Sequence, residues 1–126
     1  MYLDTDIILA LIKDEDWLKE HVDLKQMQPA KTSVFTVIEA ELVLLREYSR
    51  NDAIAVLDKL KTLKIEILPV TEPIIKQSQK LLSQYSELNI FDSIHVACAV
   101  VNDELIVSTD TVFQNILGLK RKDPRE

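Results

Sequence analysis

The fold is decided by the stretch Tyr2-Leu3-Asp4-Thr5-Asp6-Ile7-Ile8, which stands at the start of the chain. Its apolar residues predict a first strand over Tyr2–Asp4 that runs into a helix over Ile7–Lys13. Asp4 interrupts this apolar run at the point where it enters what should be a central strand. Carboxylates are seldom buried without a partner, so packing alone does not account for Asp4. The stretch predicts an α/β fold with an acid at the end of its first strand.

Further along the chain, apolar runs and helical periodicity alternate. Short strands are predicted at Lys31–Val34, Ile65–Leu68 and Leu105–Val107. Helices are predicted at Trp17–Met27, Phe35–Ser49, Asn51–Leu63, Thr71–Tyr85, Asp92–Asn102 and Asp110–Leu117. Strands that alternate with helices indicate a parallel sheet covered by helices on both faces, with ligands at the carboxyl ends of the strands. No linker or repeat divides the sequence, so residues 1–126 are predicted to form a single domain.

The composition excludes several classes of protein. Hydrophobic residues make up 47% of the chain and charged residues 29%, as in globular proteins. Gly118 is the only glycine, which excludes the P-loop and the dinucleotide-binding fingerprint. Cys98 is the only cysteine, so it forms no internal disulfide and is expected to pack in the core. No apolar run approaches the roughly 20 residues that span a bilayer. Asp4 and Asp6 stand where a signal peptide carries positive charge, so a cytoplasmic location is expected.

The charge balance limits how the chain could bind nucleic acid. The formal net charge is −6, and phosphate contacts need Lys and Arg. The objection weakens if some of the 21 acidic side chains hold divalent cations, because the cation then supplies the positive charge. The one basic stretch is Lys120-Arg121-Lys122-Asp123-Pro124-Arg125, which is either a solvated terminus or a phosphate contact.

Three acids follow predicted strands or open a predicted helix. Asp4 follows Tyr2-Leu3, Asp110 follows the strand that ends near Val107, and Asp92 opens a helix. In a doubly wound sheet these positions converge on one edge, where clustered carboxylates repel unless cations lie between them. All-oxygen ligands suit Mg²⁺ or Mn²⁺. Asp92 and Asp110 also have a purely structural explanation, since aspartate is a preferred helix N-cap.

The helix predicted at Phe35–Ser49 contains two glutamates in an almost wholly apolar setting. Glu39 and Glu41 point about 200° apart at helical spacing, so only one of them can face the acidic edge. Periodicity does not choose between them, and both are also ordinary helix formers. His95 stands one turn after Asp92, where it is either a packed, hydrogen-bonded histidine or a residue near a reacting phosphate. Asp6 either joins the acidic edge or caps the first helix.

These residues together resemble the PIN domain family, in particular the VapC-like toxins, and the resemblance covers nearly the whole chain. The motif around Asp92 is the most specific of those that carry it. The motifs are Tyr2-Leu3-Asp4-Thr5-Asp6, Thr36-Val37-Ile38-Glu39, Phe91-Asp92-Ser93-Ile94-His95-Val96-Ala97 and Ser108-Thr109-Asp110-Thr111-Val112-Phe113.

The resemblance implies a three-layer α/β/α fold with strand order 3-2-1-4-5 and hydrolysis of RNA phosphodiester bonds with Mg²⁺ or Mn²⁺. Asp4, Asp92 and Asp110 match the family's metal ligands. Glu39 matches its glutamate, as a ligand or an orienter of water, because Thr36 stands three residues before it; Glu41 is the fallback. Asp6 and Val112 depart from the pattern, since many relatives carry Asn or Ser at the first position and some carry Asp at the second. A small antitoxin partner and a homodimer are also implied.

Two other classes of function remain open at this point. The stretch Leu3-Asp4-Thr5-Asp6 also resembles the signature of haloacid-dehalogenase phosphatases, whose first aspartate is a phosphoryl nucleophile. That family needs a downstream Gly-Asp turn, which Gly118-Leu119 does not provide. The other class is a metal-free PIN relative that acts only as a binding or scaffold module, against which the presence of all four acids argues.

Overall fold

A five-stranded parallel sheet runs through the middle of the molecule in the order β3-β2-β1-β4-β5. The computed structural model describes all residues from Met1 to Glu126. The strands are short, and their bounds are β1 Tyr2–Leu3, β2 Lys31–Ser33, β3 Glu66–Leu68, β4 Ile106–Val107 and β5 Arg121–Lys122. This order confirms the predicted fold class. β5 lies in the basic stretch, which is therefore part of the sheet rather than a solvated terminus.

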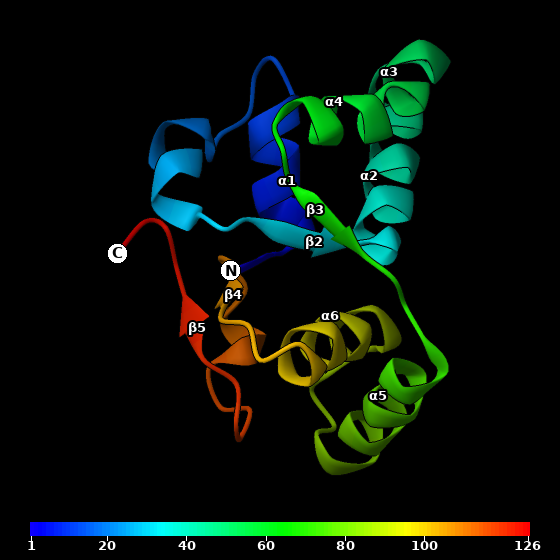
Figure 1. The fold of residues 1–126 in the computed structure, drawn as a ribbon, viewed down its shortest axis with the longest axis vertical. Helices are drawn as coiled ribbons and strands as arrows, with labels where there is room; N and C mark the ends of the chain where they lie inside the picture. Colours follow the sequence, from blue (N-terminus) through cyan, green and yellow to red (C-terminus); the bar gives the residue numbers. More distant parts are fainter.

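Helices cover both faces of this sheet, and the two layers are separate in Figure 1. One layer holds α1 to α4, and the other holds α5 and α6, which pack against each other. The helix bounds are α1 Thr5–Ile12, α2 Val34–Glu47, α3 Arg50–Ile54, α4 Val56–Thr62, α5 Glu72–Gln84 and α6 Ile90–Val101, with short 3₁₀ helices η1 Lys19–His21, η2 Leu24–Met27 and η3 Thr111–Phe113. None of these helices is long and apolar enough to cross a bilayer.

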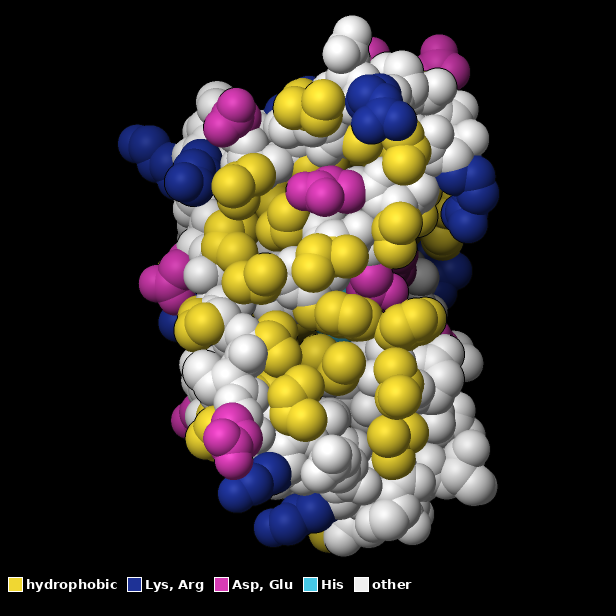
Figure 2. Space-filling model, turned by 90° about the vertical axis from the view of Figure 1, so that its right-hand side faces the viewer, with side chains coloured by type: hydrophobic (Ala, Val, Ile, Leu, Met, Phe, Trp, Pro, Cys, Tyr) yellow, Lys and Arg dark blue, Asp and Glu magenta, His cyan; other side chains and the backbone are white.

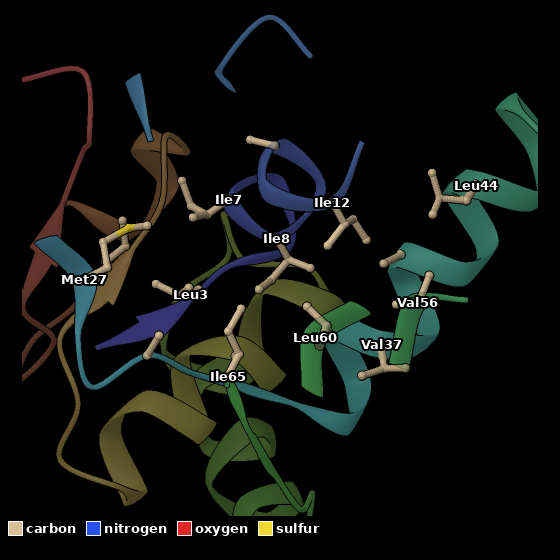
Figure 3. Close-up of a cluster of buried hydrophobic side chains, with 14 of the residues drawn as sticks. Leu3, Ile7, Ile8, Ile12, Met27, Val37, Leu44, Val56, Leu60 and Ile65 are labelled. Atoms are coloured by element: carbon tan, nitrogen blue, oxygen red, sulfur yellow. The ribbon is translucent and has the colours of Figure 1, made fainter. Parts of the chain in front are cut away.

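Strand β1 divides the core into two parts, because successive side chains of a strand point to opposite faces. Leu3 lies in the core beneath α1, α2 and α4, together with Ile7, Ile8 and Leu60. Figure 3 shows these side chains pointing toward one another from the strand and the helices. Tyr2 lies in the second core, against α5 and α6. Each fully buried aliphatic side chain contributes about 1.5–3 kcal/mol to stability, so burial fixes β1 at the centre of the sheet.

Three of the predicted helices differ from the structure. The amphipathic helix predicted at Trp17–Met27 is wrong: two 3₁₀ turns stand there, and Asp23 caps the second of them. Trp17 stays exposed, so the stretch has no continuous apolar face to bury. The helix predicted at Asn51–Leu63 is interrupted at Ala55, and its N-cap is Ser49 rather than Asn51. The last predicted helix shrinks to a single turn after Asp110.

Candidate active site

Asp4 stands at the carboxyl end of β1 and is fixed by hydrogen bonds on every side. Its amide donates to the Val107 carbonyl of β4 at 3.0 Å. Its side chain is the N-cap of α1 and accepts from the Thr5 amide at 2.8 Å. The Ser108 hydroxyl donates to its other oxygen at 2.7 Å. The residue is only 9% exposed, so Asp4 is a carboxylate held almost out of water at the end of a central strand.

Glu39 of α2 reaches the same place from the neighbouring element. The Thr5 hydroxyl donates to Glu39 Oε1 at 2.7 Å, and the same oxygen lies in a short hydrogen bond with His95 Nε2. His95 Nε2 lies 3.7 Å from Asp4 Oδ1. Glu41 is exposed and lines a hollow on the outer face of α2. Of the two glutamates, the structure brings Glu39 and not Glu41 to Asp4.

His95 is the buried hub of this arrangement. It stands on α6, and its Nδ1 forms a 2.7 Å hydrogen bond with Tyr2 Oη from β1. The Phe35 ring covers one side of the imidazole, with ring centroids 5.3 Å apart. These contacts leave little freedom for the ring, so His95 holds the Glu39 carboxylate toward Asp4. The interpretation of His95 as a packed, hydrogen-bonded histidine agrees with this geometry, and its partners are the acids themselves.

Asp92 and Asp110 lie at helix starts near the same edge. Asp92 was predicted to open the helix as a possible N-cap, but it is the third residue of α6. Asn89 is the N-cap, and the two residues form a reciprocal capping box. Asp110 caps η3 by accepting from the Val112 amide at 3.0 Å. Burial raises the pKa of Asp92, and the negative charge of Asp110 raises it further.

Asp6 joins the acidic edge, and its Oδ1 also accepts from the Ile7 amide in the first turn of α1, whose N-cap is Asp4. Its Oδ2 accepts from the Thr109 amide at 3.0 Å and from the Thr109 hydroxyl at 2.5 Å. Burial, and then the charge of Asp4, raise the pKa of Asp6 to about 6. Thr109 immediately precedes Asp110, so Asp6 fastens the loop after β4 to the start of α1.

The buried charges of this edge shift one another's ionisation. Burial raises the pKa of Asp4, and the positive charge of His95 only partly offsets it. Burial also acts to raise the pKa of Glu39, but the hydrogen bond to His95, the charge of His95 and the hydrogen bond from Thr5 together outweigh burial and lower the pKa. Burial acts to lower the pKa of His95, whereas Glu39 and Asp4 raise it overall. Strong mutual perturbation of titratable groups at one edge is typical of functional sites.

The donor set fits a hard divalent cation by its chemistry. The acids Asp4, Glu39, Asp92 and Asp110 offer only carboxylate oxygens, which Mg²⁺ and Mn²⁺ prefer. As they stand, no three acidic, histidine or cysteine side chains are gathered at coordination distance. The reason is visible in the hydrogen bonds: Asp4 and Glu39 accept from side chains of the protein, Asp92 accepts from the Asn89 amide, and Asp110 caps η3. A cation would compete with these donors.

Sequence reasoning did not assign roles to the hydroxyl groups that orient the acids. Thr5 bridges α1 to Glu39, Ser108 holds Asp4, and Tyr2 holds His95. A signal was present, because Thr5 and Ser108 stand beside strand ends in the same short motifs as the acids. Tyr2 carried no such signal, since a tyrosine in a buried strand is ordinarily core.

Several solved structures share this fold. A DNA-bound VapBC from Salmonella typhimurium has a TM-score of 0.79 at 15% identity, covering 98% of this chain and 96% of that one. VapBC-1 from nontypeable Haemophilus influenzae has a TM-score of 0.75 at 20% identity, covering 99% and 98%. Mycobacterium tuberculosis VapC20, described as a toxin that cleaves the sarcin–ricin loop, has a TM-score of 0.69 at 18% identity, covering 82% and 83%. At these identities the likeness establishes the fold alone.

Sequence comparison reaches further than these structural likenesses. No curated protein matches the sequence significantly. The sequence pattern of the PIN domain, however, matches residues 1–118, a span that takes in Asp4, Glu39, Asp92 and Asp110. The match therefore covers β1 through η3, and with it every acid of the edge described above. By sequence as well as by fold, this chain belongs to the PIN domain family.

Proposed function

We propose that this PIN domain protein is a metal-dependent endoribonuclease and the toxin of a VapBC-type toxin–antitoxin pair. One observation carries the proposal: Asp4 and Glu39 arrive from different elements and meet at His95, at the carboxyl ends of the strands. Open α/β sheets bind their ligands at that edge. A purely structural role would not require two carboxylates to be held together with so little solvent and only one histidine to offset their charge.

The chemistry proposed for the site needs a divalent cation of the Mg²⁺ or Mn²⁺ type. Asp4, Asp92 and Asp110 would hold it, and Glu39 would either add a ligand or orient the attacking water. When bound, such an ion lowers the pKa of water and offsets negative charge on the phosphate and the leaving oxygen. The protein's own contribution is positional. His95 and Thr5 fix the direction of Glu39, and Ser108 fixes that of Asp4.

RNA is proposed as the substrate on the strength of the family to which the chain belongs. A scissile phosphodiester is itself anionic, so an edge this acidic can accept it only with the help of cations. Mycobacterium tuberculosis VapC20 is described as cleaving the sarcin–ricin loop, which supports an RNA substrate of the same chemical class. The particular RNA is not part of the proposal.

Two glutamates of one helix make the sharpest test. Glu39→Gln should reduce Mg²⁺-dependent cleavage of a labelled RNA by at least tenfold, because removing a group that acts in the transition state typically costs 10²-fold or more. Glu41→Gln is the matched control, since it makes the same change at an exposed glutamate on the outer face of α2, and its rate should equal that of the unmodified protein. Equal rates for both variants would place catalysis elsewhere.

Calorimetry separates an enzyme from a scaffold. Titration of Mn²⁺ into the protein should release or absorb heat with saturation, and Asp4→Asn should weaken that binding. A binding or scaffold module without metal would give no saturable heat in either protein. Beryllium fluoride on an aspartate mimics the phosphoryl-enzyme intermediate of haloacid-dehalogenase phosphatases. It should therefore not bind to Asp4 of this protein.

A small antitoxin is proposed to cover the apolar outer face of α2 and α3. Figure 2 shows hydrophobic side chains gathered over this side of the molecule, above and below its middle. The large exposed apolar residues of α2 and α3 are Val34, Ile38, Leu42, Leu45 and Ile54. Contiguous apolar surface of this kind marks interaction sites. Several structures of the same fold are described as toxin–antitoxin complexes, which supports an antitoxin as the occupant.

Leu42→Asp tests this surface, because a charge in the middle of an apolar interface is strongly unfavourable. The variant should lose binding to the antitoxin in a pull-down while keeping its cleavage rate, since Leu42 is 61% exposed and takes part in none of the hydrogen bonds of the acidic edge. The family resemblance also implies a homodimer, which light scattering on the unmodified protein and the Leu42→Asp variant checks. Loss of dimerisation in the variant with antitoxin binding intact would assign the face to a second copy instead.

A further inference from the structure

The C-terminal residues return to the acidic edge because of the sheet topology. Strand β5 pairs in parallel with β4, so the residues after Lys122 leave the sheet at the edge where Asp4 and Asp110 stand. Asp123 is buried there and binds Arg125 through three contacts, of 2.9, 3.0 and 2.6 Å. This clamp fixes the direction of the Arg125 guanidinium.

Arg125 faces the acidic edge and an exposed indole at once. Its Nη2 donates to the Thr109 carbonyl at 3.4 Å, one residue before Asp110. The guanidinium carbon lies 5.8 Å from the centre of the Trp17 ring. The Arg125 side chain is 40% exposed, and its Nη1 makes no hydrogen bond within the protein. The Trp17 residue is 65% exposed. A cation and an aromatic ring are thus both open to solvent beside the proposed cleavage site.

We propose that Trp17 and Arg125 form a nucleotide subsite for the RNA strand, with a base stacked on the indole and a phosphate bound by the guanidinium. The inference rests on the proposed nuclease function and adds to it a place for the substrate beyond the acids. Sites for single strands combine aromatic stacking platforms with cations that follow the backbone. Arginine binds phosphate through charge-assisted hydrogen bonds, and Nη1 of Arg125 is free to donate them, whereas Nε and Nη2 already donate to Asp123 and Thr109.

The local charges place the two halves of the nucleotide. The hollow beside Trp17 carries three acids and one lysine, Glu15, Asp16, Glu20 and Lys19. The Lys19 ammonium already donates to the Ala10 and Lys13 carbonyls, so the acids dominate and repel a phosphate from that side of the ring. The base therefore falls on the indole and the phosphate on Arg125. A simpler explanation, that the pair only fastens the C-terminal residues, accounts for the clamp of Arg125 to Asp123. It does not account for the open ring of Trp17, because exposing so large an apolar surface brings no stability.

Intrinsic fluorescence gives a direct measurement, since Trp17 is the only tryptophan. The Asp92→Asn background keeps the RNA intact during the experiment. A short single-stranded oligouridine should quench the Trp17 emission, and an oligomer of the same length with abasic sites should not. In fluorescence anisotropy, Trp17→Ala should bind the oligouridine roughly tenfold more weakly, as one lost stacking contact implies. Arg125→Gln should lower the slope of log K against log salt by about 0.7.

The second cation–aromatic pair of the chain is a matched control. Lys13 lies 5.6 Å from the centre of the Tyr48 ring, at the far end of α1 from Asp4. Tyr48→Ala removes an exposed aromatic of the same kind away from the edge, so its affinity for the oligouridine should not change. Should Trp17→Ala fold poorly in a thermal melt, the conservative Trp17→Phe variant should retain most of the affinity.

The outcomes separate this inference from the proposed function. Binding of the oligouridine without quenching of Trp17 overturns the subsite, and so does equal affinity in the Trp17→Ala and Tyr48→Ala variants. Absence of any binding overturns it as well. If base-dependent quenching is found but the unmodified protein cuts no RNA with Mg²⁺, the subsite stands and the nuclease function fails. If RNA is cut and quenching is absent, the reverse holds.

Discussion

Two nearly buried aspartates stand at the same edge of the sheet and are treated in opposite ways. Asp4, which is 9% exposed, has one serine hydroxyl and one backbone amide as hydrogen-bond donors, with His95 at 3.7 Å. Asp123, which is 4% exposed, has the guanidinium groups of both Arg121 and Arg125. Burial raises the pKa of Asp4, whereas the hydrogen bonds of Arg125 lower the pKa of Asp123 to about 2.

The difference shows what each carboxylate is for. The charge of Asp123 is neutralised inside the protein, so it can stabilise the fold by holding β5 and the residues after it. The charge of Asp4 is only partly compensated by His95. The negative charges of Glu39 and Asp6 add to it at the same edge of the sheet. A protein gains no stability from gathering such groups. A cluster like this is understandable if its positive charge comes from a bound cation, and the predictions below test that division of roles.

The largest effect is expected for Asp92→Asn. Asparagine keeps the size of the side chain and can still accept the bond of the Asn89 amide, so α6 should remain folded. Losing a metal ligand should reduce Mg²⁺-dependent RNA cleavage by roughly several hundred-fold or more. A labelled RNA cleavage assay measures the rate, and thermal melting in EDTA measures the fold. Asp58→Asn, on an exposed face of α4, is the control. A near-normal rate in a folded Asp92→Asn protein would leave Asp92 with a capping role only.

Asp123→Asn should have the opposite effect: the free energy of unfolding should fall, and the rate of RNA cleavage should not. Removing the carboxylate leaves the nearly buried Arg121 guanidinium without its charge partner, and breaking such a pair costs about 2–3 kcal/mol. The free energy of unfolding in urea should fall by that amount, while the cleavage rate at saturating RNA in the surviving folded protein stays within a few-fold. A variant as stable as the unmodified protein would show that the clamp is a surface feature.

The acid dependence of the same clamp gives a smaller effect. The pKa of Asp123 is about 2 in the folded protein and about 3.9 in an unfolded chain. A depressed carboxyl pKa contributes stability that is present above about pH 4 and is lost as the pH falls toward 2. That contribution is at most about 2.6 kcal/mol, since one pKa unit is worth about 1.4 kcal/mol. Between pH 5 and pH 2, the free energy of unfolding in urea should therefore fall less in Asp123→Asn than in the unmodified protein. Parallel curves would contradict the pairing.

The smallest expected effect is a gain of stability from Asp6→Asn without metal. Burial and Asp4 raise the pKa of Asp6 to about 6, so the folded protein binds a proton more tightly than the unfolded chain. The stability that Asp6 contributes therefore falls as the pH rises from about 4 to about 6. Above that range Asp6→Asn should be more stable by about 1 kcal/mol, discounted for partial exposure. Urea unfolding in EDTA at pH 7.5 and pH 4 measures this gain, which should vanish at the lower pH. A loss at both values would mean that the Thr109 hydrogen bonds dominate.

Much of the fold could be predicted because short apolar runs and helical periods alternate along the chain. The position of β1 followed from Tyr2 and Leu3, which the core buries on opposite faces. β5 could not be found this way, since Arg121 and Lys122 carry no apolar signal and pair only because β4 offers them an edge. The predicted helix at Trp17–Met27 failed for the opposite reason: its apolar residues do not share a buried face, and local turns satisfy its backbone.

The acids of the site could be predicted, but the hydrogen bonds that orient them could not. Acids at strand ends are visible in the sequence, because topology carries the ends of parallel strands to one edge. The choice of Glu39 over Glu41 rested on the resemblance, since either could face the edge by periodicity; in the structure Thr5 and His95 contact Glu39. The contact between His95 and Tyr2 spans 93 residues, and no local pattern encodes such a pairing.

The hydrogen bond from the Asp4 amide to the Val107 carbonyl also bears on how the edge moves. This amide belongs to the ladder between the two central strands, so its exchange with deuterium should require opening of the whole domain. The Asp110 amide donates only to the Ser108 hydroxyl, ahead of a single turn at Thr111–Phe113, and should exchange through local opening. Asp4 is thus expected to belong to the slowest-exchanging part of the molecule, whereas Asp110 lies in a segment that can open while the domain stays folded.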